Sequence, residues 1–98
     1  MDAEPPRQLE LFQNFPNPFN PTTTISFSLL EKTHAVLSIY DVAGRLVTTL
    51  VDDELDEGLQ EGTWDGKDAN GSAVGSGVYF CRLTAGNKTL TKKMILLK

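Results

Sequence analysis

The sequence has little cysteine or histidine. Its single cysteine, Cys81, excludes an internal disulfide and a cysteine-cluster metal site. Cys81 stands in the apolar segment 77–83, which favours a small buried side chain over a reactive thiol. The single histidine, His34, begins a strand-like stretch beside a turn, a position typical of an exposed residue rather than a general base. Nothing in the sequence supports a catalytic triad.

Positive charge and long apolar runs are also scarce. Lys and Arg number 9 against 13 Asp and Glu, a formal net charge of −4. This balance argues against nucleic-acid binding, which depends mainly on clustered cations. No run approaches the roughly 20 apolar residues of a membrane-spanning helix. Residues 1–6 lack the basic and apolar regions of a signal peptide, and we interpret the chain as a module excised from a larger protein.

The length of 98 residues fits one domain. The hydrophobic fraction of 40% and the charged fraction of 22% are near globular averages, so the chain should fold. In a domain this small, most of the core is needed for stability, which leaves little room for a water-excluded catalytic chamber. An enzyme is therefore the least favoured function.

The N-terminal residues divide into a polar linker and the start of the domain. Residues 1–8 are polar and contain Pro5 and Pro6, which indicates a linker or an expression remnant. The domain then occupies residues 9–98, and residues 9–12 are expected to pair weakly at a sheet edge.

A proline-rich motif, FPNPFNP at residues 15–21, follows. Each proline fixes φ and pushes the preceding residue toward an extended conformation, which excludes a helix and predicts a stiff corner. We expect Asn17 and Asn20 to cap their own turns and Phe15 and Phe19 to fold onto the sandwich edge.

Beyond this corner the apolar residues alternate with a period of two, as half-buried strands require. In residues 24–29, Ile25, Phe27 and Leu29 share one face. Further strands are expected at residues 35–40, 46–51, 59–64, 77–84 and 89–97.

Two connections between these strands carry specific expectations. Residues 41–44 supply hairpin-turn chemistry. Val47 and Leu50 cannot both point inward on a regular strand, so the return strand should contain a bulge or end early. The acidic residues 52–58 are interpreted as a solvated loop. The whole pattern predicts an all-β, immunoglobulin-like antiparallel β-sandwich of about seven strands, with a compact barrel as the alternative.

Three oxygen-bearing side chains in one turn raise the question of calcium: Asp65, Asp68 and Asn70. Asp68 and Asn70 fit the third and fifth positions of an EF-hand loop. The first position holds Gly66, however, and the twelfth holds Gly77 instead of a bidentate glutamate. We favour a structural turn built on side-chain hydrogen bonds over a metal site, and no other cofactor is indicated.

The aromatic residues and the last strand suggest two kinds of binding. Trp64, Tyr40 and Tyr79 could stack on sugar rings, although the position of Trp64 at a strand end is typical of the core. Residues 91–98, TKKMILLK, join basic and apolar residues, and Met94 and Leu96 are expected to lie opposite Ile95 and Leu97 on the strand. They predict an edge strand whose unpaired backbone groups are available for strand addition by a partner.

Five blocks in a fixed order carry a family resemblance: FPNPFNP at 15–21, IYDVAGRLV at 39–47, WDG at 64–66 with Asp68 and Gly71, SGVY at 76–79, and KMILLK at 93–98. In these blocks the chain from Leu11 to Lys98 resembles the type IX (Por) secretion system C-terminal sorting domain, type A, of Bacteroidetes and relatives. The same sandwich is similar to the immunoglobulin-like part of the flagellar hook-capping protein. The sequence departs from the family at Gln60 and Gly62, where apolar residues are usual, and at Cys81, where an aromatic residue is common.

The resemblance implies a non-catalytic signal domain at the C-terminus of a larger cargo protein. It would direct that cargo through the periplasm and an outer-membrane translocon to the cell surface or the medium, where a sortase-like peptidase could remove it. The implied recognition tail is Lys92, Lys93, Met94, Ile95, Leu96, Leu97 and Lys98. The implied fold-keeping residues are Pro16, Asn17, Pro18, Phe19, Gly44, Trp64, Gly71, Gly77 and Tyr79. The alternatives are an accessory carbohydrate- or cell-wall-binding module and a structural spacer of a secreted enzyme.

Overall fold

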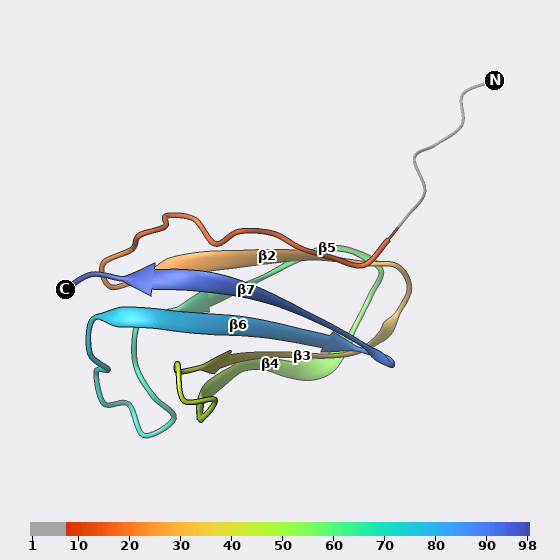
Figure 1. Ribbon diagram of the computed structural model, residues 1–98. Coiled ribbons are helices and arrows are strands. Elements are labelled where there is room, and N and C mark those ends of the chain that lie inside the picture. The colour runs from red at the N-terminus through yellow and green to blue at the C-terminus, as the bar shows by residue number, and fades with distance from the viewer. Residues whose placement is uncertain (1–7) are drawn as a thin grey trace.

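Two antiparallel sheets packed face to face make up the computed structural model, which describes residues 8–98 (Figure 1). The strands are β1 (Glu10–Leu11), β2 (Thr23–Leu29), β3 (Thr33–Tyr40), β4 (Leu46–Leu55), β5 (Gly58–Trp64), β6 (Gly77–Ala85) and β7 (Lys88–Leu96). One sheet has the order β1-β2-β5 and the other β4-β3-β6-β7. The predicted seven-stranded sandwich is confirmed, and the barrel alternative is wrong because the sheets do not join. Among the described residues there is no helix that could cross a membrane.

The sandwich core is built by the alternation that the sequence showed. Ile25, Phe27 and Leu29 of β2 are buried, and so are the inward residues of the central strands β3 and β6. Their burial on one face of each strand is the main source of stability in a domain of this size. The predicted pairing of residues 9–12 at a sheet edge is also confirmed, since β1 pairs with the edge of β2.

The β3–β4 hairpin contains two register shifts, one at Leu50 and one at Val47. The register passes from Leu37↔Val51 to Ser38↔Thr49, so Leu50 has no partner across the ladder. A second shift between Ile39 and Tyr40 leaves Val47 unpaired in the same way. Each extra residue lets an apolar side chain turn toward the core, against which Val47 and Leu50 pack.

The bulge prediction is therefore confirmed, whereas the early end and the acidic loop are wrong. Strand β4 continues to Leu55, and its acidic residues 52–54 pair with β3. A charged sequence can extend an edge strand here because the side chains of Asp52, Asp53 and Glu54 remain in water.

The surroundings of Gly62 explain why β5 lacks an apolar side chain at a position where the family that it resembles usually has one. A Cβ at Gly62 would lie 2.9 Å from Cδ2 of Leu37, which is fully buried, and 3.5 Å from Cγ2 of Val51. The opposite sheet thus approaches the β5 backbone closely, and side chains of β3 and β4 fill the space that a β5 side chain would occupy. Gln60 is half-buried and donates a 3.0 Å hydrogen bond to the Asp56 carbonyl.

Candidate functional site

The implied recognition tail lies on β7 and just beyond it, and its side chains divide into two sets. Met94 and Leu96 are fully buried, while Ile95 is half-buried. Lys92, Lys93, Leu97 and Lys98 are exposed. The predicted opposition of Met94 and Leu96 to their neighbours is confirmed. The four exposed side chains are accessible to another molecule and Ile95 is accessible in part, whereas Met94 and Leu96 belong to the core.

Residues 13–19, which we name the strap, cover the outer edge of the last part of β7. The Ile95 N–H donates to Asn17 Oδ1 at 3.0 Å, and the Phe19 N–H donates to the Ile95 carbonyl at 3.0 Å. The Leu97 N–H then donates to the Phe19 carbonyl at 3.0 Å, and Gln13 Nε2 donates to the Lys93 carbonyl at 2.8 Å. The strap therefore runs parallel to β7 at the Phe19↔Leu96 bridge and satisfies this edge.

The strap begins on the other sheet. The Phe12 N–H donates to the Ser26 carbonyl, and Phe15 exchanges two backbone hydrogen bonds with Thr24 of β2. In Figure 1 the strap follows β2 before the chain turns near the C-terminal end of β7. It thus links the edges of both sheets on one side of the sandwich.

Two side chains fix the strap in place. Phe19 is 2% exposed, and its ring lies 5.5 Å from the Trp64 ring between centroids. Asn14 is buried, and its Nδ2 donates to both the Pro16 carbonyl and Thr23 Oγ1 at 3.0 Å. The Thr23 hydroxyl also donates to the Pro16 carbonyl at 2.8 Å. A buried amide with satisfied hydrogen bonds specifies one path for the chain.

The expectations for this segment need three corrections. Phe15 is 80% exposed, because its backbone rather than its ring joins the sheet edge; only Phe19 folds inward as predicted. Asn17 does not cap its own turn but accepts the distant Ile95 N–H. The predicted open edge over the tail is wrong from the Lys93 carbonyl onward, because the strap occupies those backbone groups.

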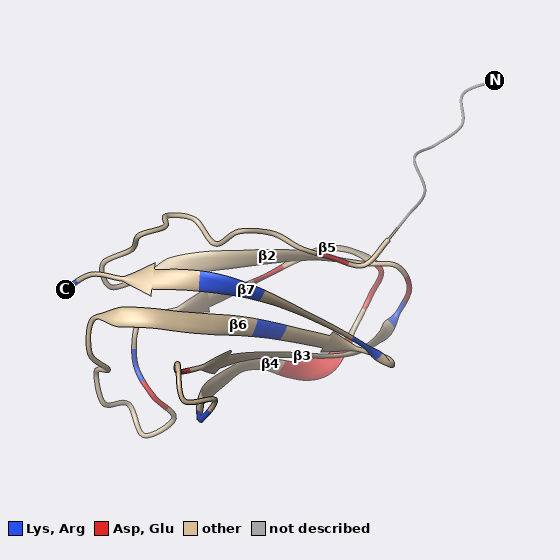
Figure 2. Ribbon diagram, in the orientation of Figure 1, with Lys and Arg blue, Asp and Glu red and all other residues tan. Residues whose placement is uncertain are grey.

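The water-facing side of the four-stranded sheet carries aromatic and basic side chains next to the tail. Tyr40 pairs across the strands with Phe80, and Phe80 pairs with Lys93. The Arg82 guanidinium lies 4.3 Å from the centre of the Tyr40 ring, a cation–π contact. Figure 2 shows the basic residues on β6 and β7 and the acidic residues on β4, so the two edges of this sheet carry opposite charge.

In the loop considered for calcium, one side-chain oxygen of each aspartate accepts backbone N–H groups. Asp68 Oδ1 accepts the N–H groups of Asn70 and Ser72 at 2.9 and 3.0 Å, and Asp65 Oδ1 accepts the Lys67 N–H at 3.2 Å. These are the side-chain-capped turns that we favoured from the sequence. Within residues 8–98, no three His, Cys, Asp or Glu side chains form a group that could hold a metal ion.

The aromatic residues considered for sugar stacking are mostly inaccessible. Trp64 is 1% exposed, and its Nε1 donates to the Lys67 carbonyl at 2.9 Å, as expected for a core residue. Tyr79 is buried beside it with ring centroids 5.1 Å apart, and its hydroxyl donates to the Gly75 carbonyl at 2.7 Å. Burial raises the pKa of Tyr79, and the charge of Asp41 adds to this effect. The buried pair of aromatic rings serves the core rather than a ligand.

The two side chains considered for catalysis lie on different strands. Cys81 is buried on β6, which confirms the predicted buried side chain, and burial raises the pKa of its thiol to about 12. His34 is exposed near the start of β3, where its Nε2 lies 2.6 Å from Oδ1 of Asp52.

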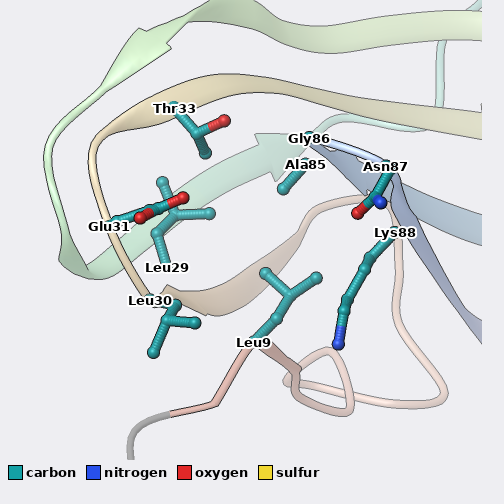
Figure 3. Close-up of a pocket in the computed structure, with 9 residues that line it drawn as sticks. All are labelled: Leu9, Leu29, Leu30, Glu31, Thr33, Ala85, Gly86, Asn87 and Lys88. Atoms are coloured by element: carbon teal, nitrogen blue, oxygen red, sulfur yellow. The ribbon is translucent and has the colours of Figure 1, made fainter.

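One end of the sandwich contains a pocket of about 120 Å³ (Figure 3). Its lining is Leu9, Leu29, Leu30, Glu31, Thr33, Ala85, Gly86, Asn87 and Lys88. The lining includes no cysteine or histidine, and its charged side chains are one carboxylate and one ammonium. The β7 tail with its strap is therefore the strongest candidate site.

Sequence reasoning missed the strap as a partner of the tail. The motif FPNPFNP predicted a corner, but nothing in it indicates that Asn17 and Phe19 bond to β7. Asn17 is 78 residues from its partner Ile95, and Gln13 is 80 residues from its partner Lys93. The unequal fates of Phe15 and Phe19 likewise depend on which ring faces Trp64.

Comparison with known proteins gives a consistent result. The family described as "Secretion system C-terminal sorting domain" matches residues 13–97. The basal-body rod modification protein FlgD of Salmonella typhimurium is 39% identical over 67 residues, which are 67% of this chain and 29% of that protein. The chain thus spans less than a third of the curated relatives that it matches.

Solved structures show the same fold. Dimeric latent PorU from Porphyromonas gingivalis has a TM-score of 0.69 and 25% identity, over 99% of this chain and 10% of that chain. PorZ, a surface component of the type-IX secretion system of the same organism, has a TM-score of 0.63 and 22% identity, over 92% and 11%. FlgD from P. aeruginosa has a TM-score of 0.62 and 22% identity, over 79% and 66%.

Proposed function

The chain belongs to the secretion system C-terminal sorting domain family, a non-catalytic family, and from this premise we propose how it acts. It directs an attached cargo protein through the type IX (Por) translocon of the outer membrane to the cell surface or the medium. A sortase-like peptidase is the second proposed partner, acting on the exported protein. The recognition element is the set of exposed tail side chains, Lys92, Lys93, Leu97 and Lys98.

The observation that supports this assignment is the rigid presentation of the tail. Met94 and Leu96 hold the strand in the core, and the strap fixes its backbone. The exposed lysines are thus displayed at fixed spacing, and a receptor meets them without ordering a flexible segment. Such preorganisation lowers the entropic cost of recognition.

The test is export of a fluorescent protein fused in front of residues 9–98 in a type IX-competent bacterium. Deleting the whole tail is a poor variant, because it also removes the core residues Met94 and Leu96. We therefore replace Lys92, Lys93 and Lys98 by glutamine, which keeps the core intact. The matched control replaces Lys32, Arg45 and Lys67, three exposed cations on other elements, by glutamine.

The expected result is that the parent fusion and the control reach the medium or surface, whereas the tail variant remains in the periplasm. Equal export of the tail variant and the control would refute the role of these lysines. Retention of the parent fusion itself would refute the sorting function of this chain.

A further inference from the structure

The strap makes no hydrogen bond to the first half of the outer β7 edge, and β1 contacts β7 without pairing with it. We call this half the uncovered edge. Backbone groups of successive residues in an antiparallel strand point alternately to the two sides. Since Ile95 and the Lys93 carbonyl bond to the strap, Thr91 and Thr89 present their N–H and C=O groups to the same edge. Within residues 8–98, neither the outward backbone groups of Thr89 and Thr91 nor the Lys93 N–H has a hydrogen-bond partner.

The strap shows that this edge accepts an added backbone. Phe19 already forms backbone hydrogen bonds with Ile95 and Leu97 in a parallel bridge. The backbone groups of Thr89 and Thr91 lie on the same edge of β7 and can pair with a strand in the same way. A strand added at Thr89 and Thr91 would continue the four-stranded sheet beyond β7.

The charge around the uncovered edge defines the chemistry of the partner. Lys88, Lys92 and Lys93 are exposed on β7, and Arg82 lies across from Thr91 on β6. Residues 69–98 contain no Asp or Glu. Neighbouring segments carry two carboxylates, Glu10 on β1, which contacts β7, and Glu31, which lines the pocket with Lys88. Within residues 8–98, neither forms an ion pair with a β7 lysine. Lys92 and Lys93 project from opposite faces of the strand because successive side chains alternate. Two copies of this edge would bring lysine against lysine, which opposes pairing of the domain with itself.

We propose that the β7 edge at Thr89, Thr91 and Lys93 is a strand acceptor for an extended acidic segment of a partner protein. Backbone hydrogen bonds supply the binding, and carboxylates opposite Lys92 and Lys93 select the partner. The inference deepens the proposed function by naming the chemistry of the molecule that reads the region of the tail, and it rests on that function for its biological role.

The experiment uses nuclear magnetic resonance of the 98-residue protein with a short blocked peptide of glutamate, threonine and valine. In the free protein, the amides of Leu90, Lys92, Ile95 and Leu97 should exchange slowly and those of Thr91 and Lys93 quickly. The acidic peptide should slow exchange at Thr89, Thr91 and Lys93 and bind with a dissociation constant of the order of 1 mM. The same peptide with lysine in place of glutamate, or N-methylated on its pairing edge, should not bind.

Two variants make the test specific. Lys92→Glu with Lys93→Glu should weaken binding of the acidic peptide about tenfold, since each exposed pair contributes a few-fold in affinity. Lys32→Glu with Lys67→Glu changes the net charge equally and should leave binding unchanged. Thr91→Pro removes an outward N–H without breaking the β6–β7 ladder and should abolish binding.

Several results would overturn the strand acceptor: no saturable binding up to about 5 mM, equal binding of the basic peptide, or exchange protection at another edge. The peptide assay is independent of export. Peptide binding without export of the fusion would refute the proposed function alone, and export without peptide binding would refute the strand acceptor alone.

Discussion

Replacing Phe19 by alanine tests the energetic role of the strap, and Phe15 in the same motif provides the control. Phe19 is 2% exposed and contacts Trp64, whereas Phe15 is 80% exposed. Removing a buried phenylalanine ring costs about 3–5 kcal/mol, from lost transfer free energy and the cavity left behind. Removing an exposed ring should change the free energy of unfolding by less than about 0.5 kcal/mol.

For a domain whose whole stability is of the order of 5–15 kcal/mol, this is a large fraction. Each kcal/mol lowers the melting temperature of a domain this size by about 4–8 °C, so Phe19→Ala should melt at least about 12 °C lower. The urea midpoint should fall by roughly 1.5–3 M. Urea unfolding followed by Trp64 fluorescence measures both variants.

The same variant should reveal whether Phe19 anchors the strap. Hydrogen exchange at the Ile95 and Leu97 amides, which bond to the strap, should accelerate more than exchange at the buried ladder between β3 and β6. Equal losses of stability in Phe15→Ala and Phe19→Ala would refute this account. Uniform acceleration across the sheet would refute the local anchoring.

Three further predictions concern the core and the titrating groups. Gly62→Ala should lose about 1–3 kcal/mol of unfolding free energy in urea titrations through the contact with the opposite sheet, whereas Gly75→Ala, with open space at its Cβ, should be neutral; equal effects would contradict the close approach. Burial raises the pKa of the Cys81 thiol from 9.0 to about 12, so the contribution of Cys81 to stability should decline as the pH rises above 9.0. The thiol should react with a thiol reagent only as fast as the protein unfolds, and rapid labelling of the native protein would refute its burial. The pKa of Asp41 lies below its ordinary 3.8, chiefly because its carboxylate accepts the Arg45 N–H. Its stabilisation of the hairpin is therefore present above pH 3.8 and lost as the pH falls. Asp41→Asn should reduce the acid sensitivity seen in urea unfolding, and an unchanged pH profile would count against the contact.

The strands were predictable because their signal is local. Alternation in residues 24–29 directly specifies which side chains of β2 are buried, and the unequal spacing of Val47 and Leu50 predicted the bulges in β4. The continuation of β4 through residues 52–54 was not predictable from composition, since acidic side chains fit a loop and a water-facing edge strand equally well.

The candidate site was only partly predictable. The family resemblance located the tail, and periodicity separated Met94 and Leu96 from the exposed residues. The covering of its edge by the strap depends on contacts between residues far apart in sequence, and neither motif contains them by itself. The glycine at position 62 illustrates the same point, because its reason lies in Leu37 on the opposite sheet.

The parallel arrangement of the strap and β7 also determines how the domain carries mechanical load. The described chain starts at one end of the sandwich and reaches Lys98 at the other (Figure 1). A pull between Gln8 and Lys98 drags the strap and β7 past each other along their common axis. The hydrogen bonds at Ile95 and Leu97 are then loaded sideways and must break together instead of opening one after another. A force between the two ends of the described chain therefore loads this contact in shear, not by peeling.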